Sequence, residues 1–224
     1  YHYYKRHERK QMQKLQRETR LNNLLLKSIR LKSIPHFNSN VLAGIEYFIM
    51  NHSVEEANKY LALYSRFTNT LLMDVDKPSR SLDKELEYAR LYLTLEQLRY
   101  GDNLAYDIRI DPQANKSIQV PNMMLHTYCE NAVKHGLRNK PGRGHLLIEV
   151  KARKGGVCVS VTDDGVGRKA AATLSATSTK QGLNIMEQQI ELYNQHNSEH
   201  IVQTVTDLKD TDGNACGTRF ELYI

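Results

Sequence analysis

The chain has few cysteines, the residues that form disulfides or bind zinc, with three among its 224 residues. It also has no tryptophan. Cys129, Cys158 and Cys216 are too widely spaced for a metal or redox motif, so we expect reduced thiols and no zinc site. The apolar runs are much shorter than the ~20 residues that a membrane-spanning helix requires. With 40% hydrophobic and 25% charged residues, the composition instead predicts an ordinary globular core.

The positive charge is concentrated in the first 32 residues. This segment contains ten lysines and arginines but two glutamates, so the rest of the chain is slightly acidic although the whole chain carries +6. A nucleic-acid-binding surface is not expected, because the basic residues are not spread over a folded face. The opening YHYYKRHERK places aromatic residues before cations, as at the cytoplasmic end of a membrane helix. We expect a juxtamembrane helix over residues 1–20; a solvated charged helix is the alternative.

Helical patterns fill the first hundred residues. Residues 5–32 lack glycine and proline, and apolar spacing of 3 and 4 continues past Pro35 to Met50. A second helix is expected from Ser53, a candidate cap, to about Leu71, and a third over residues 81–101. The first two form an antiparallel hairpin. Because one hairpin cannot bury both of its faces, we expect two chains to pair into a four-helix bundle.

From about residue 103 the pattern changes to short alternating segments. NLAYDIRID, HLLIEVKAR, VCVSVTD, HIVQTVTDL and GTRFELYI predict strands, with a hairpin turn at Gly155 and Gly156. Helical patterns lie between them, in VPNMMLHTYCENAVKHGL and QGLNIMEQQIELYNQHN. The predicted class is α+β, with an α/β sandwich in which helices cover one face of a mostly antiparallel sheet. Residues 168–181 are small and polar, and we expect a mobile loop there.

Four short motifs in this second half are candidates for nucleotide binding, although no P-loop is present. ENAVKHG places polar side chains on one helical face, and VTDDGVGR follows a strand-ending acid with two glycines that permit close backbone approach. KQGLN opens a helix whose N–H groups could face phosphates, and CGTRF lies at the start of a strand.

Each motif alone is weak. An asparagine in a helix, such as Asn131, is more often a surface residue, and DDG is more often a plain turn. The histidines outside these motifs are expected to be ordinary surface or core residues: His52, His126, His145, His196 and His200.

Together and in this order, the motifs resemble the asparagine and glycine boxes of the GHKL ATP-binding superfamily. PHFNSN beside ENAVKHG further resembles the LytS-type sensor histidine kinases, whose signatures run PHFxFN and ENAxKHG. The resemblance covers residues 21–224. It implies that His36 is the phosphoacceptor, that Glu130 is the catalytic acid of the asparagine box and that Asn131 is the Mg²⁺ ligand. The remaining implied nucleotide contacts are His135, Asp163, Gly165, Gly167, Lys180, Gly182, Leu183, Gly217 and Thr218.

The resemblance also implies a domain organisation and partners. Residues 21–100 would form the dimerisation and histidine phosphotransfer domain, and residues 101–224 a GHKL (Bergerat-type) ATP-binding domain. The expected cofactors are ATP and Mg²⁺. The expected partners are a second copy of the chain and a response regulator, for which the LytTR type is one candidate. The expected place is the cytoplasmic side of an inner-membrane sensor.

Two positions depart from the family pattern. Ser39 stands where the family has phenylalanine, and Lys180 stands where the first glycine of its GxG is expected. These departures keep a second hypothesis open, a degenerate nucleotide-binding signalling dimer without kinase chemistry. A GHKL ATPase is a third hypothesis, although it leaves the hairpin around His36 unexplained. Pro35 bends a helix and can turn His36 outward, which favours the kinase.

Overall fold

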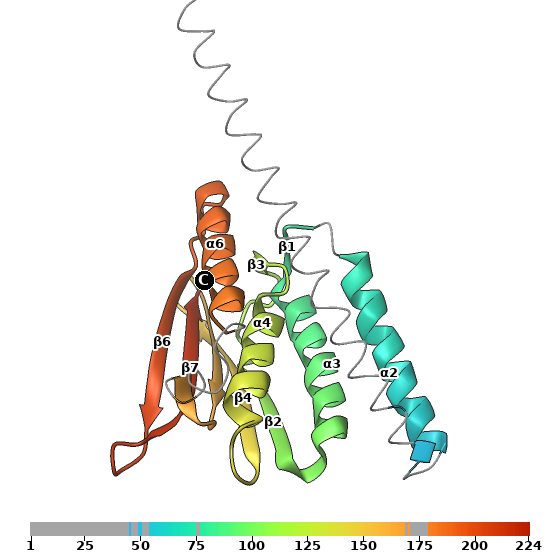
Figure 1. Cartoon of the computed structure of the whole chain (residues 1–224). Helices are drawn as coiled ribbons and strands as arrows, with labels where there is room; N and C mark the ends of the chain where they lie inside the picture. The colour runs from blue at the N-terminus through green and yellow to red at the C-terminus, as the bar shows by residue number, and fades with distance from the viewer. Residues whose placement is uncertain (1–44, 46–48, 51–53, 75–76, 169, 171–178) are drawn as a thin grey trace, which may run out of the picture. The chain divides into compact units, whose positions relative to one another are not determined.

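The computed structural model describes residues 45, 49–50, 54–74, 77–168, 170 and 179–224 (Figure 1). The chain divides into two compact units, residues 1–57 and residues 58–224. The juxtamembrane segment, most of the first predicted helix and His36 lie outside the described residues. Among the described residues, no helix is both long and apolar enough to cross a membrane. The fold described below is that of the second unit.

The helices of this unit lie where the sequence predicts them. They are α2 (Val54–Met73), α3 (Leu82–Tyr100), α4 (Met124–Asn131), which continues as a π-helical turn (Ala132–Leu137), and α6 (Thr179–His196). The prediction of a loop over residues 168–181 is wrong for its last three residues, because α6 begins at Thr179. Lys180 and Gln181 are good helix formers, and Gly182 is tolerated inside the first turn rather than marking the boundary.

The sheet has five strands in the order β2-β4-β5-β7-β6. They are β2 (Leu104–Ile110), β4 (Gly144–Arg153), β5 (Gly156–Asp163), β6 (Val202–Lys209) and β7 (Ala215–Tyr223). Only the β2–β4 pair is parallel; the other pairs of this sheet are antiparallel. The α+β class and the mostly antiparallel sheet are therefore confirmed. The hairpin between β4 and β5 turns at Gly155, whose φ of 87° favours glycine.

Two three-residue strands were not predicted. β1 (Ser79–Ser81) and β3 (Gln119–Pro121) pair antiparallel in a separate two-stranded sheet. The sequence DKPSR instead predicts a break, because three residues are too few for an alternating pattern to be recognised. The small sheet joins the segment after α2 to the segment before α4.

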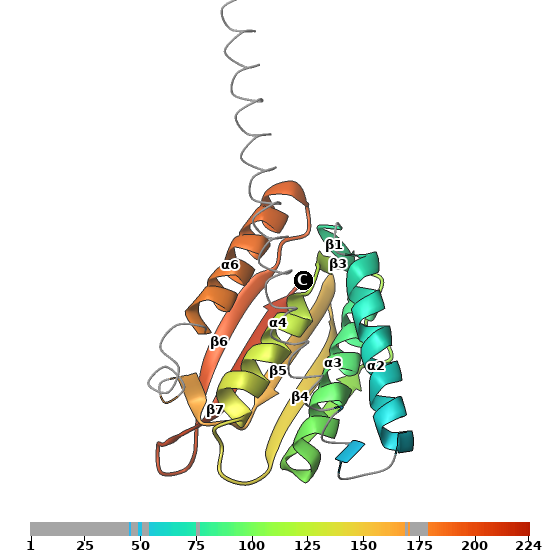
Figure 2. The same cartoon turned by 45° about the vertical axis from the view of Figure 1, so that its right-hand side comes forward.

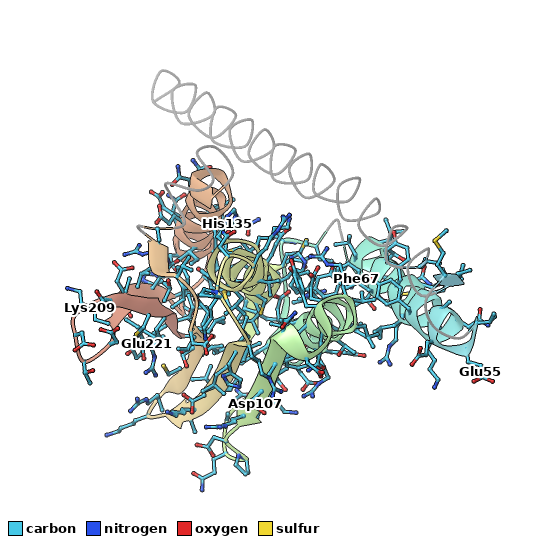
Figure 3. All side chains as sticks on the ribbon, turned by 60° about the horizontal axis from the view of Figure 1, so that its bottom comes forward. Glu55, Phe67, Asp107, His135, Lys209 and Glu221 are labelled. Carbon is cyan, nitrogen blue, oxygen red and sulfur yellow. The ribbon has the colours of Figure 1, made fainter. Side chains whose placement is uncertain are left out.

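The unit has two layers. Helices α3, α4 and α6 lie side by side over one face of the sheet (Figure 2). Figure 3 views the layers end on, with Asp107 and Glu221 on the other side of the sheet. The core between the layers is built from alternate strand residues and inward-facing helix residues, including Leu146, Ile148, Val150, Val159, Val161, Leu222, Met124, Leu125 and Tyr128.

An aromatic cluster joins α2 to α3 and α4. Phe67, labelled in Figure 3, stacks on Tyr88 with ring centroids 4.6 Å apart. The ring of His126 lies 5.2 Å from that of Tyr88 and 4.7 Å from that of Tyr92. His126 is 5% exposed, so it is the core histidine that the sequence allowed. Burial among these rings lowers the pKa of His126 to about 4.

This burial predicts a pH-dependent stability. His126 is neutral in the fold, whereas the unfolded chain takes up a proton below pH 6.5, so the free energy of unfolding should fall between pH 6.5 and pH 4. The fall due to this one residue is up to ~3 kcal/mol. Urea denaturation of the wild type and of His126→Phe across this range should show a shallower fall for the variant. Equal slopes in the two proteins would contradict the prediction, and His200→Asn, at an exposed histidine, serves as the control.

Candidate functional site

A buried acid ends the central strand β5. Asp163 is 3% exposed and lies opposite Thr218 of β7. The backbone N–H of Gly165 donates to Asp163 Oδ1 at 2.9 Å. Burial raises the pKa of Asp163 to about 6, and the backbone donors of Gly165 and Thr218 partly oppose this rise. The carboxyl group is therefore ionised at neutral pH and can accept a hydrogen bond from a ligand.

Glycines allow three backbone segments to meet around this acid. A Cβ atom on Gly136 would lie 2.6 Å from Asp163 Oδ1, and one on Gly165 would lie 2.3 Å from the carbonyl carbon of Gly136. A Cβ atom on Gly217 would lie 2.0 Å from the carbonyl oxygen of Asp163, and the φ of Gly217, 140°, also favours glycine. The backbone N–H of Val166 donates to the Gly136 carbonyl at 3.2 Å. The turn after α4, the loop after β5 and the start of β7 thus form one close-packed cradle.

Glu130 and Asn131 end α4 beside this cradle. The Lys134 ammonium pairs with Glu130 one helical turn away. Burial opposes ionisation of Glu130, but its interactions with His126 and with the Lys134 ammonium hold its pKa below the usual value. The Nδ2 atom of Asn131 is buried and has no hydrogen-bond partner among the described residues. A buried amide donor in this condition can donate to an acceptor atom of a bound ligand, whereas a cation would need the carbonyl oxygen of the same side chain.

His135 lies in the π-helical turn, on the helix side of the sheet (Figure 3). It is half-buried, and burial together with the Lys134 charge lowers its pKa, so it is a neutral hydrogen-bonding group at pH 7. π-helical turns of this kind are frequent at functional sites.

The predicted site residues fall into three described groups, and His36 lies outside the described residues. The first group lies where β5 ends and β7 begins and contains Asp163, Gly165, Gly167, Gly217 and Thr218. The second, the α4 group, adjoins it and contains Glu130, Asn131 and His135. The third group lies at the start of α6, where Lys180 is the second residue, Gly182 the fourth and Leu183 the fifth. Gly182 does not open that helix as predicted, but as its fourth residue it carries one of the four N–H groups that lack a partner within the helix. The roles assigned to all these residues stay predictions.

Sequence reasoning missed three residues of this region. Gly136 and Lys134 are part of ENAVKHG, but their contacts with Asp163 and Glu130 appear only in the folded chain. Asp164 accepts from the His145 backbone N–H at 2.8 Å and pairs with Lys140 at 2.8 Å. This carboxylate fastens the loop between the π-helical turn and β4. The doubled acid in VTDDG was the available signal, since one aspartate faces the cradle and the next one turns away from it.

Comparison with known proteins finds similarity to histidine kinases. A family model described as histidine kinase matches residues 24–104. The sensor protein LytS of Staphylococcus epidermidis is 29% identical over 155 residues, which are 67% of this chain and 26% of the relative. The sensor histidine kinase/phosphatase LytS of Staphylococcus aureus is 31% identical over 67% of this chain and 26% of that protein.

Over about two thirds of its length, the chain is similar to LytS-type sensor histidine kinases. The sensor histidine kinase YesM of Bacillus subtilis is also similar, at 25% identity over 82% of this chain and 32% of that protein. Among solved structures, a mycobacterial sensor histidine kinase, MprB, is 15% identical with a TM-score of 0.45, covering 65% of this chain and 95% of that one. The chain spans about a quarter of the length of the LytS relatives that it matches.

The cradle predicts an unusual response to a glycine substitution. Alanine normally stabilises a helical position relative to glycine, by up to ~1 kcal/mol. At Gly136 the added methyl would meet the Asp163 carboxyl, so Gly136→Ala should instead lower the free energy of unfolding, by about 1–3 kcal/mol. Chemical denaturation of the two proteins measures this change.

Gly144→Ala is the matched control for this substitution. Its added methyl meets the apolar side chain of Leu137, with Cδ2 at 2.9 Å and Cβ at 3.1 Å, so it creates crowding of similar closeness without meeting a carboxyl group. A Gly136→Ala protein as stable as the wild type, or destabilised no more than Gly144→Ala, would show that the cradle does not require glycine.

Proposed function

We propose that this chain is the transmitter module of a sensor histidine kinase, which phosphorylates its own His36 with ATP and passes the phosphoryl group to an aspartate of a response regulator. The family match over residues 24–104 includes His36 and so supports this assignment. The observation that carries the nucleotide-binding part is the buried Asp163 carboxyl within its glycine cradle. A buried acid of raised pKa at a strand end is a functional-site feature with a physical cause.

Asp163 would recognise the adenine base. Its ionised carboxylate can accept a hydrogen bond from the exocyclic amino group, because two oxygens offer about four acceptor positions and the backbone donors of Gly165 and Thr218 do not fill them. Gly165 and Gly167 would let the backbone approach the base closely, and Gly217 and Thr218 would close the neighbouring strand side.

The α4 group and the start of α6 would hold the phosphates. Asn131 would ligate Mg²⁺, whose oxygen preference suits an amide carbonyl and triphosphate oxygens. When bound, the ion would neutralise charge on the phosphates. His135 and Lys180 would contact phosphate oxygens, and the backbone N–H of Gly182 in the first turn of α6 would do the same, with Leu183 beside it.

In the proposed transfer, a ring nitrogen of neutral His36 attacks the γ-phosphorus of ATP. The bond from that phosphorus to the bridging oxygen breaks, and ADP leaves with the electron pair. Glu130 would accept the proton from the other ring nitrogen, which its lowered pKa permits because the carboxylate is ionised at neutral pH. Lys134 now pairs with Glu130, so the carboxylate must exchange this partner for the imidazole.

The partners follow from the same assignment. The parent protein would be a homodimer formed through the helical hairpin, anchored in the membrane with this part on the cytoplasmic side. Its partner would be a response regulator, of the LytTR type if the resemblance extends that far, and not a nucleic acid. The exposed apolar residues of α2, Leu61, Leu72 and Met73, are consistent with a helical interface.

Labelling with ATP tests the proposed function. Incubation with ATP labelled at the γ-phosphate and Mg²⁺ should produce an acid-labile, base-stable phosphoprotein from the wild type and essentially none from His36→Ala. The reason is that no other histidine carries the nucleophile's role in this account. His200→Ala, at an exposed histidine, should label like the wild type.

Equal labelling of the wild type and His36→Ala would sink the kinase assignment. Tight ATP binding without transfer in a full-length, stimulated sensor would favour the degenerate signalling dimer, and steady phosphate release without a phosphoprotein would favour an ATPase.

A further inference from the structure

A buried carboxylate on α3 caps the helix that carries the proposed catalytic group. Glu85 is completely buried, and its two oxygens accept the backbone N–H groups of Met123 at 2.8 Å and Leu125 at 2.9 Å. These two amides lie at the start of α4 and have no partner within that helix. Met123 has a φ of 64°, unusual for a residue with a side chain, and the Glu85 contact holds it there.

Arg80 joins this cap to the connector after α2. Its side chain is 2% exposed, and its Nε donates to Glu85 Oε1. The guanidinium carbon lies 4.8 Å from the ring centroid of Tyr88 on α3. Arg80 is the middle residue of β1, opposite Val120 of β3. Because both charges are buried, removing either one leaves the other without compensation, and the pair therefore resists separation.

Asn122 makes a second link between the same segments. Its Nδ2 donates to the carbonyl of Asp74 at 2.5 Å and to that of Lys77 at 3.0 Å. Its backbone N–H donates to the carbonyl of Pro78 at 3.0 Å. Asp74 directly follows the last residue of α2, so the end of α2 is attached to the residues that open α4.

The backbone groups that Glu85 accepts and the proposed Mg²⁺ ligand lie at opposite ends of α4. Met123 and Asn131 are eight residues apart, so about 12 Å along the helix axis separates them. A helix of this length transmits a movement of one end to the other, whereas Asp163 belongs to the sheet and is not attached to this cap.

We propose that Glu85 is a positioning residue for the phosphate side of the nucleotide site, and that with Arg80 it makes the end of α2, the connector and α4 one rigid body. A displacement at the end of α2 then moves Glu130 and Asn131 relative to the base-binding Asp163. This inference rests on the proposed function. It makes α4, which carries Glu130 and Asn131, the part of the site that moves.

Nucleotide binding with and without Mg²⁺ separates the two sides of the site. Titration calorimetry with ADP in Mg²⁺ and in EDTA gives the gain in affinity that the ion supplies. Glu85→Gln keeps the size of the side chain but replaces the capping charge and leaves Arg80 unpaired. We expect about a tenfold loss of the Mg²⁺-dependent gain, the size typical of removing support for a metal ligand. The loss of affinity in EDTA should be smaller, because there His135 is the proposed phosphate contact of the α4 group.

Val159→Ala is the control, because Val159 is a fully buried core residue of β5 whose side chain makes none of the hydrogen bonds of the cap. At a temperature where both variants are folded by circular dichroism, it should leave the Mg²⁺-dependent gain intact. Glu85→Gln that weakens both affinities alike, or neither, would overturn the proposal. If Glu85→Gln does not fold, Arg80→Met is tested in its place, because Glu85 then loses its buried charge partner but keeps its two backbone donors. An unchanged Mg²⁺-dependent gain in Arg80→Met would also overturn the proposal.

Amide hydrogen exchange tests the positioning role of Glu85 without any nucleotide. In the nucleotide-free protein, Glu85→Gln should speed exchange of the α4 amides, residues 123–131, while the amides of β5 stay as protected as in the wild type. Unchanged exchange in α4 would refute the positioning role. Failure of the wild type to bind ADP at all would refute the proposed nucleotide site and leave this readout intact, so the two failures are distinguishable.

Discussion

The close approach of three backbone segments around one buried carboxyl group is the constraint on which this unit depends. A carboxyl group at a strand end would normally face water, where it ionises without cost. At Asp163, Gly136, Gly165 and Gly217 bring the π-helical turn and β7 so near that the acid is enclosed, and its pKa rises to about 6. Burying this charge without a cationic partner costs free energy of folding, and a hydrogen-bond donor on a bound ligand would offset part of that cost.

The helical layer supplies the second half of the site, and a buried charge pair holds it. Glu85 and Arg80 fix the start of α4, whereas Lys134 pairs with Glu130 within the continuous helix near its end. Apolar packing alone would allow a helix of eight residues to slide or rotate, because such contacts have no direction. The hydrogen bonds from Glu85 set the position of the start of α4, while the aromatic cluster around His126 attaches α2 to the same layer.

The sequence predicts what depends on local patterns and misses what depends on tertiary contact. The strands β2, β4, β5, β6 and β7 alternate along their length, so their positions and the α+β class were predictable. The short pair β1 and β3 carries no period, and its strands are 38 residues apart, so only folding brings Arg80 opposite Val120. The motif residues Asp163 and Asn131 were found because of a family resemblance. Gly136 and Glu85 were not, since a glycine and a helical glutamate show their roles only through what they touch.

Base selectivity tests the central claim, that the Asp163 carboxylate reads the base. An ionised carboxylate accepts the amino hydrogen of adenine but repels the carbonyl oxygen at the same position of guanine, whereas an asparagine amide can donate to that oxygen. The measurement is the Kd of ATP and of GTP for the wild type and for Asp163→Asn, by titration calorimetry at pH 7.5. The account predicts a clear preference for ATP in the wild type that is lost or reversed in Asp163→Asn. An equal preference for ATP in both proteins would contradict it.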